Sequence, residues 1–164
     1  MRIAGIVLII IFYMVSVCGA AANESEGFGG MVWGDSPVGK KNLRLLGYDM
    51  EAAFYEPIDK PKTVKIGSNS FRLKDIQYTF FDQEFARVLL IVDGTSHNAV
   101  VDELRKVYGP PAVRKLLVVT NYYWKGDKTL IELSVTPKVC TLQYTSKELL
   151  SRQLQKEGST IDSY

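Results

Sequence analysis

A hydrophobic period of two in the middle of the chain constrains the fold more than any other feature. Ile76, Tyr78 and Phe80 alternate with more polar neighbours, as expected for a strand with one buried face. Phe71 and Leu73 alternate too, but on odd numbers, so the phase changes between Leu73 and Ile76. A strand whose inward face switches in this way needs an extra residue, so the sequence predicts a bulge or a turn at this point.

The segment after this strand predicts a hairpin and then a helix. Asp82-Gln83 is expected at the hairpin tip, and the apolar run Val88–Val92 predicts a central strand that is covered on both faces. Ser96 is a suitable helix cap and Gly109, before two prolines, a suitable helix end. Apolar residues recur between them at helical spacing, namely at Val100, Leu104, Val107 and Tyr108.

The last third of the chain repeats this plan. Val118–Trp124 predicts a strand, and Gly126-Asp127 suits a two-residue hairpin turn. Two further strands are expected, with Ile131, Leu133, Val135, Cys140, Leu142 and Tyr144 on the core side. Thr145-x-x-Glu148 has the form of a capping box for a final helix. The repeated plan is compatible with an internal duplication, but strand pairs followed by a covering helix are common, and we prefer that explanation.

The start of the globular part is less regular. A short helix is expected after Trp33-Gly34, with Asp35 or Ser36 as its cap, Pro37 as its first residue and Gly47 as its end. A strand over 50–56 and a loop over 57–62 follow.

These elements predict one α+β domain, with a mostly antiparallel sheet of about five to seven strands and two or three helices on one face. The chain of 164 residues is long enough for one domain with its own core. We expect a leader over 1–22, a flexible lead-in over 23–30, the domain over 31–158 and a frayed tail over 159–164.

The leader has the order of a secretory signal peptide. Arg2 is followed by the uncharged apolar stretch Ile3–Val17, and then by small residues that suit cleavage after Ala20 or Ala22. Two alternatives remain: the stretch stays uncleaved as a membrane anchor, or Cys18 is lipidated. Val17 is bulky for the position before a lipidated cysteine. We therefore expect a chain exported to the periplasm or secreted, which touches a membrane only in the two alternatives.

Composition excludes several classes of function. A net charge of +2 provides no strongly charged field that would collect nucleic acid or anionic lipid. One histidine and the one cysteine that remains after cleavage past Cys18 cannot form a structural zinc site, and no glycine loop with phosphate-binding spacing is present. We expect no metal, no cofactor and no nucleic-acid partner.

Catalytic candidates are few. His97 is the only histidine in the sequence, and Cys140 is the only thiol that remains after cleavage of the leader. A thiol-dependent or hydrolytic enzyme would therefore need both side chains in one cleft. The period of two places Cys140 on the apolar face, and His97 is expected in the exposed first turn of a helix. We therefore expect no catalytic residues and a protein that is not an enzyme.

Aromatic residues supply the remaining candidates. Trp33, Phe81, Tyr123 and Trp124 lie where the pattern does not fix burial, and exposed Tyr and Trp side chains commonly anchor binding surfaces. The alternative is that another element covers them.

Three stretches support a resemblance: Gly29-Gly30-Met31-Val32-Trp33-Gly34-x-Ser36-Pro37, Val107-Tyr108-Gly109-x-Pro111, and Tyr123-Trp124-Lys125-Gly126-Asp127 followed by Thr129-x-Ile131-x-Leu133. With these the chain resembles a loose group of small exported bacterial proteins of unknown function that share a Trp-Gly-x-Ser start. The resemblance implies a bacterial cell-envelope setting and no transferable activity.

We therefore expect a small extracytoplasmic, non-enzymatic module that binds a protein or an envelope component. The alternatives are a lipid-anchored assembly or quality-control factor that uses Cys18 and, less favoured, an enzyme that uses Cys140 and His97. The sequence specifies neither the partner nor the oligomeric state.

Overall fold

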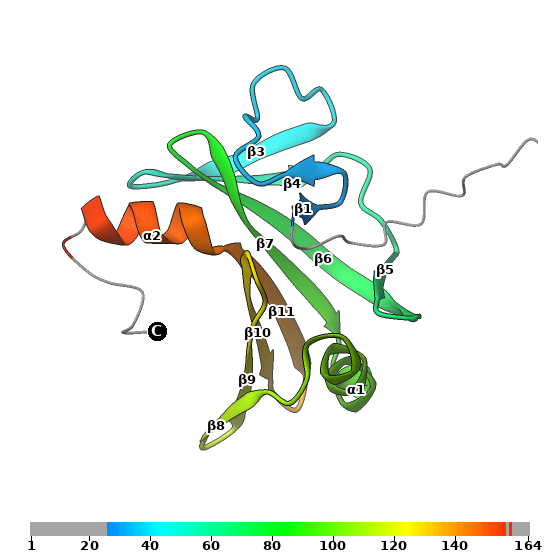
Figure 1. Ribbon diagram of the computed structural model, residues 1–164. Coiled ribbons are helices and arrows are strands. Elements are labelled where there is room, and N and C mark those ends of the chain that lie inside the picture. Colours follow the sequence, from blue (N-terminus) through cyan, green and yellow to red (C-terminus); the bar gives the residue numbers. More distant parts are fainter. Residues whose placement is uncertain (1–25, 157, 159–164) are drawn as a thin grey trace, which may run out of the picture.

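A large antiparallel sheet dominates the computed structural model, which describes residues 26–156 and 158 (Figure 1). The strands are β1 (Gly27–Phe28), β2 (Met31–Val32), β3 (Leu43–Asp49), β4 (Ala52–Pro57), β5 (Thr63–Ile66), β6 (Asn69–Phe81), β7 (Glu84–Asp93), β8 (Ala112–Leu116), β9 (Val119–Lys125), β10 (Thr129–Val135) and β11 (Val139–Ser146). The helices are the 3₁₀ turn η1 (Gly94–Ser96), α1 (His97–Tyr108) and α2 (Lys147–Lys156). The expected α+β class is confirmed, with two α-helices in the described residues and more strands than predicted.

The sheet consists of two halves with the same strand arrangement. Its order is β3-β4-β6-β7-β11-β10-β9-β8, with β5 as an additional strand paired with the start of β6. Apart from β5, the first half consists of the outer hairpin β3–β4, the inner hairpin β6–β7 and helix α1. The second half consists of the outer hairpin β8–β9, the inner hairpin β10–β11 and helix α2. The strand that precedes each helix, β7 or β11, meets the other half at the centre of the sheet. The repeated plan seen in the sequence therefore extends to the outer hairpins.

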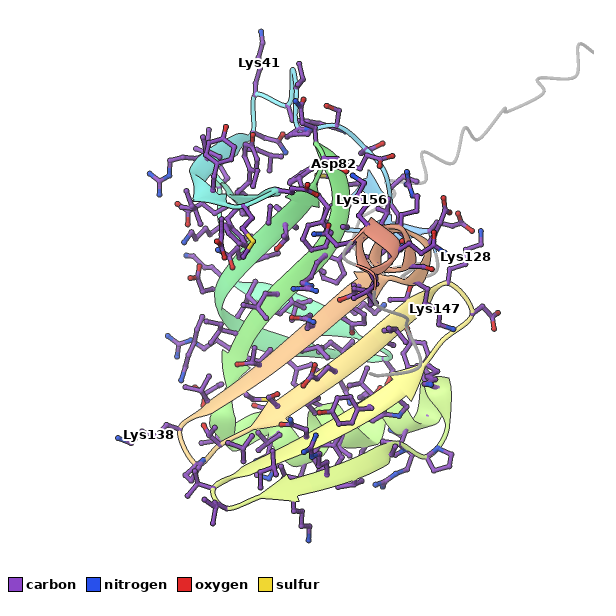
Figure 2. All side chains as sticks on the ribbon, turned by 90° about the vertical axis from the view of Figure 1, so that its left-hand side faces the viewer. Lys41, Asp82, Lys128, Lys138, Lys147 and Lys156 are labelled. Atoms are coloured by element: carbon purple, nitrogen blue, oxygen red, sulfur yellow. The ribbon has the colours of Figure 1, made fainter. Side chains whose placement is uncertain are left out.

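The two helices lie on opposite sides of the sheet, which corrects the prediction that they pack on one face (Figures 1 and 2). α1 lies against β5 and β9, and its buried side chains belong to the main core. α2 contacts β7 and β11 from the other side. The connections explain the difference, because β11 continues directly into α2, whereas the three-residue turn η1 separates β7 from α1.

The predicted phase change in β6 is confirmed. The pairing of β6 with β7 shifts register between Leu73 and Asp75, so Leu73 and Ile76 both point into the core. The hairpin tip at Asp82-Gln83 is also present, and both residues have positive φ.

The central position of β7 is as predicted, but its two faces are not equally covered. Val88, Leu90 and Val92 are fully buried, whereas Leu89 and Ile91 are half-buried. The expectation of full cover on both faces was wrong because α2 leaves part of the outward sheet face open (Figure 2).

The β1–β2 hairpin closes one side of the core. Phe28 stacks on Tyr144 with ring centroids 5.5 Å apart, and Trp33 stacks on Phe85 at 4.7 Å. The expected lead-in over 23–30 is therefore too long, because Gly27 and Phe28 form a strand and Phe28 is buried. The expected leader over 1–22, residues 23–25 of the lead-in and the expected tail over 159–164 lie outside the described residues.

No helix forms between Asp35 and Gly47, contrary to prediction. Gly34 and Asp35 form backbone hydrogen bonds with Phe85 of β7, and the chain then enters β3, which contains Gly47. These long-range bonds hold the segment against the sheet, so local helix signals do not decide its structure. Strand β8 was missed because all five of its side chains are exposed and give no hydrophobic period.

The helix boundaries agree closely with the predictions, whereas some side chains do not. α1 ends at Gly109, whose φ is 80°. Val107 is 55% exposed rather than buried, and Glu103 is buried in its place. Ser146, one residue after the expected cap Thr145, caps α2 by accepting a hydrogen bond from the Leu149 amide at 3.4 Å.

Two i,i+3 ion pairs form along α1, one between Asp102 and Arg105 and the other between Glu103 and Lys106. Over residues 26–156 and 158, neither helix has the length and apolar character needed to cross a bilayer.

Candidate binding site

The four predicted aromatic residues do not form one patch. Trp124 is 3% exposed, and its indole nitrogen donates to the Gly109 carbonyl at 2.9 Å, so it belongs to the core. Phe81 and Tyr123 lie half-buried on the outward sheet face. Trp33 lies elsewhere, against Phe85 beneath the β1–β2 hairpin.

The outward aromatics have partners of their own. The Arg87 guanidinium lies 5.5 Å from the Phe81 ring centre, and the Tyr123 hydroxyl accepts a hydrogen bond from Asn121 at 3.0 Å. The structure therefore divides the predicted surface between the core, the outward sheet face and the hairpin.

The two reactive candidates are held in structural positions. Cys140 is fully buried in the core, and burial raises the pKa of its thiol to about 11, so at neutral pH it is a neutral thiol. His97 Nδ1 lies 2.9 Å from the Gly94 carbonyl at the start of α1. Cys18 lies outside the described residues. Among those that are described, no group of three or more His, Cys, Asp or Glu side chains is arranged to hold a metal ion.

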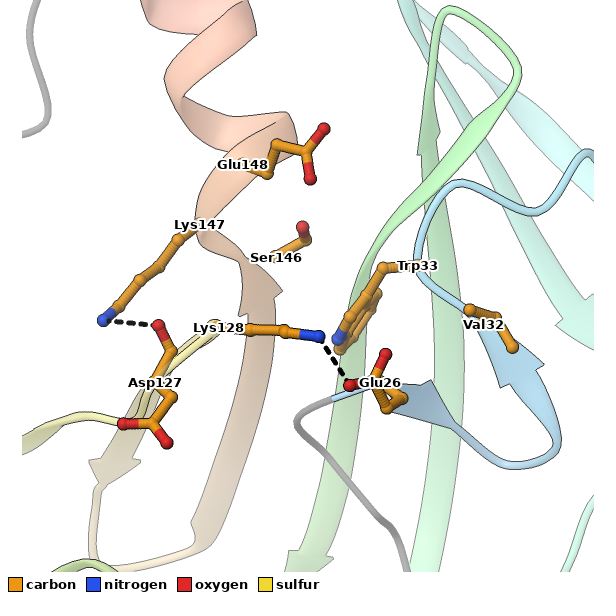
Figure 3. Close-up of a pocket in the computed structure, with 8 residues that line it drawn as sticks. All are labelled: Glu26, Val32, Trp33, Asp127, Lys128, Ser146, Lys147 and Glu148. Atoms are coloured by element: carbon orange, nitrogen blue, oxygen red, sulfur yellow. Dashed lines mark hydrogen bonds and ion pairs between the residues drawn. The ribbon is translucent and has the colours of Figure 1, made fainter.

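Trp33 lines a polar cleft of about 290 Å³ between the β1–β2 hairpin, the β9–β10 turn and the start of α2 (Figure 3). The cations in its wall already have partners. Lys128 pairs with Glu26 at 2.6 Å, and Lys147 donates to the carbonyls of Gly126 and Asp127. An anionic ligand would have to displace these contacts, so among the described residues this cleft offers no free cation for recognition.

A larger and more apolar cavity lies on the other side of the same hairpin. We call it the hairpin cavity; its volume is about 450 Å³. It is lined by Phe28, Gly29, Asp59, Pro61, Thr63, Val64, Lys65, Ser70, Leu73, Ile76 and Tyr78. The aromatic and branched side chains among these are buried, and the polar ones, from Asp59 to Ser70, are exposed at the rim. A space of this size with apolar walls and a polar rim is a candidate small-molecule site.

Tyr78 is the polar group inside this cavity. Only 6% of the residue is exposed, and its ring packs edge-on against Phe85 with centroids 5.6 Å apart. No residue within the described part of the chain forms a hydrogen bond with its hydroxyl. Burial raises its pKa to about 12, so the hydroxyl stays protonated and acts as a hydrogen-bonding group rather than as a base.

Gly29 keeps the space beside this hydroxyl open. A Cβ at position 29 would lie 3.1 Å from the Tyr78 hydroxyl oxygen, and the φ of Gly29 is +63°, which disfavours other residues. The hydroxyl is not fully enclosed by protein, so a ligand that enters the cavity can form a hydrogen bond with it in place of solvent.

The sequence indicated only part of this site. Tyr78 was assigned correctly to the buried side of its strand, but the alternation that identifies a buried tyrosine does not show whether its hydroxyl has a partner. The cavity forms because the β1–β2 hairpin, the 58–62 loop and β5 meet over β6, and no local pattern encodes that meeting.

Comparison of the chain with protein-family models, with curated proteins and with solved structures finds no match.

Proposed function

We propose that this chain is an exported, non-enzymatic binding module, and that the hairpin cavity holds a small envelope component. Its ligand has an apolar chain or ring that fills the cavity and one polar group that bonds to Tyr78. The observation that carries the proposal is the pairing of a 450 Å³ space that has apolar walls with the Tyr78 hydroxyl, which opens into that space and forms no hydrogen bond with the described residues.

The chemistry of the walls defines the ligand class. Phe28, Val64 and Ile76 favour apolar surface, since burial of such surface contributes about 25 cal/mol per Å². Asp59 and Lys65 stand at the rim with opposite charges, which favours neither an anion nor a cation. A largely neutral molecule of mixed character fits these walls best.

A role as a binding module also agrees with the state of the reactive groups. The Cys140 thiol is buried and neutral, and the Tyr78 hydroxyl is far from ionising at neutral pH. Neither group is prepared for nucleophilic or general-base chemistry. Export remains part of the proposal because it rests on the signal-like order of residues 1–22.

A pair of matched probes tests the proposed site. Binding of 2-naphthol and of naphthalene is measured by displacement of the fluorescent dye N-phenyl-1-naphthylamine from the purified protein. Both compounds have an apolar ring system, but only the naphthol has a hydroxyl. We expect Tyr78→Phe to weaken 2-naphthol binding by about 2–12-fold, the equivalent of one net hydrogen bond, and to leave naphthalene binding unchanged.

Trp33→Phe is the control, because Trp33 lines the neighbouring polar cleft and not the hairpin cavity. It should leave the binding of both probes unchanged. The proposal fails if neither probe binds, or if Tyr78→Phe affects the two probes equally. Mass spectrometry of lipid extracts from protein purified out of its envelope fraction then identifies the natural ligand.

A further inference from the structure

The β8–β9 hairpin presents an apolar tip to solvent. Leu116, Leu117 and Val118 are all exposed, and Leu117 has no part of its side chain covered. Leu116 pairs with Val119, so Leu117 and Val118 form the two-residue turn. Two-residue hairpin turns favour Gly, Asn or Asp because their backbone needs positive φ. A leucine and a valine at this turn are therefore unusual.

The backbone at this tip is strained in a way that a polar residue would avoid. Leu117 has a φ of 42°, in the left-handed region that few residues other than Gly, Asn and Asp adopt. Such a conformation is a reason to look for a function, since a more suitable residue would relieve both the strain and the exposure. Leu117 therefore combines full exposure with an unfavourable backbone conformation.

Three cations lie at the end of the sheet that carries the tip. Arg114 and Lys115 precede the tip on β8. Lys138 lies in the β10–β11 turn at the same end of the sheet (Figure 2). The register shows this, because Val135 at the end of β10 pairs with Thr120 at the start of β9 and with Cys140 at the start of β11. In the described part of the chain, none of these three cations forms an ion pair. The acid opposite Val139 in the sheet, Asp93, pairs with Lys74 at 3.7 Å. The end of the sheet that carries the tip is therefore locally positive.

The corresponding hairpin of the other half provides an internal comparison. Met50 and Glu51 form the two-residue turn between β3 and β4, and Met50 is 95% exposed with a φ of 50°. The neighbours of Met50 are Asp49 and Glu51, so this tip is acidic. It lies at the other end of the strands, beside Lys156 of α2, which is 3.9 Å from Glu51. The two tips share a backbone conformation and differ in charge.

We propose that the β8–β9 tip inserts into the headgroup region of an anionic lipid bilayer. Leu116, Leu117 and Val118 enter the apolar boundary, and Arg114, Lys115 and Lys138 meet the lipid phosphates. Burial of apolar area combined with attraction to anionic lipid is the physical basis of binding at a membrane interface. The three cations favour an anionic lipid surface over an apolar pocket of a partner protein as the binding site. They form no ion pair within the described residues, and a lipid surface offers many phosphates to them.

Vesicle flotation of the protein purified from its producing cells tests this proposal. Vesicles contain phosphatidylcholine with or without phosphatidylglycerol. We expect binding to the mixed vesicles, and a loss of about tenfold or more in Leu117→Asn, because that substitution removes the buried area of one leucine. Replacement of Arg114 and Lys115 by Gln should weaken binding by roughly fivefold for each charge.

Met50→Asn is the matched control. Asparagine tolerates the left-handed conformation at both tips, so neither Met50→Asn nor Leu117→Asn should lower the melting temperature. Met50→Asn should leave flotation unchanged, and it carries the same N-terminal segment as Leu117→Asn, so any contribution of that segment cancels between the two variants.

A fluorescent label gives a second readout. NBD attached to Leu117→Cys, in a chain with Cys18→Ser, should shift to shorter wavelength on vesicles, and NBD on Met50→Cys should not. Equal flotation of Leu117→Asn and the unaltered protein would overturn the proposal. So would equal binding to vesicles without phosphatidylglycerol, or Leu117-dependent self-association in place of vesicle binding, which would identify a second copy as the partner.

Discussion

Leu90 and Leu142 face each other across the central strand pair, in register, and both are completely buried. Leu90 lies on β7 and Leu142 on β11, the last strands of the two halves, so this pair marks the point about which the strand order is mirrored. The side chains contributed by the two halves meet here in one core. The contact makes the halves parts of one domain rather than two independent units.

Truncation of either leucine should therefore destabilise the whole domain. We expect Leu90→Ala and Leu142→Ala each to lower the free energy of unfolding by about 2–5 kcal/mol, as measured by urea denaturation. The double variant should lose less than the sum, because the two cavities merge. Leu89→Ala, on the half-buried side of the same strand, is the control and should cost clearly less. Additive losses would show that the two side chains are not coupled.

Glu103 should make stability depend on pH. This side chain on α1 is 2% exposed and accepts hydrogen bonds from the amide and hydroxyl of Ser68, each at 2.8 Å, and from Lys106. Hydrogen bonds from Lys106 and then Ser68 lower its pKa from 4.5 to about 2. Because the folded pKa is the lower one, this stabilisation is present above pH 4.5 and is lost as the pH falls toward 2.

Glu103→Gln should therefore reduce the change in urea midpoint between pH 6 and pH 3, and should lower stability at neutral pH. Glu148→Gln is the control, because the Glu148 carboxylate is 83% exposed and its contact with Arg152 is long, at 3.8 Å. A pH dependence that is the same in Glu103→Gln and in the unaltered protein would show that the Ser68 contact does not stabilise the fold.

Cys140 should react with thiol reagents only when the protein unfolds. The residue is fully buried and the pKa of its thiol is raised to about 11, so reactive thiolate is scarce at neutral pH. In a chain with Cys18→Ser, we expect no reaction with Ellman's reagent in native buffer and one thiol per chain in urea. Rapid stoichiometric reaction of the native protein would place Cys140 at an accessible position and would reopen the thiol-enzyme alternative.

Gly27 should be essential for the β1–β2 hairpin. A Cβ at this position would lie 1.9 Å from the Met31 carbonyl oxygen, which is backbone and cannot rotate away. We expect Gly27→Ala to cost about 1–3 kcal/mol of stability and to weaken naphthalene binding in the hairpin cavity.

Gly47→Ala is the matched control for Gly27→Ala. A Cβ at position 47 meets nothing within 4 Å, so stability should stay within about 0.5 kcal/mol of the unaltered protein. Unfolding in urea and dye displacement measure both variants. Unchanged probe binding in Gly27→Ala would show that the hairpin does not shape the cavity.

Local sequence was a good guide wherever one side of an element meets the core. The alternation around Ile76, the bulge after Leu73 and the end of α1 at Gly109 all appear as predicted, because burial imposes a period and turns impose particular residues. The same reasoning failed for 35–47, where distant backbone bonds to Phe85 override helix signals, and for β8, whose exposed side chains have no period.

The amino-acid sequence alone determined the class of fold, most of the strands and the buried faces of their side chains, since these depend on neighbours in the chain. It also indicated that Cys140 lies in the core, and it left Trp33, Phe81, Tyr123 and Trp124 undecided. Tertiary structure decided which of these are buried, that the Tyr78 hydroxyl opens into a cavity, and that Arg114, Lys115 and Lys138 gather around one apolar tip. Such features depend on which distant segments meet, and a net charge of +2 averaged over the whole chain does not reveal them.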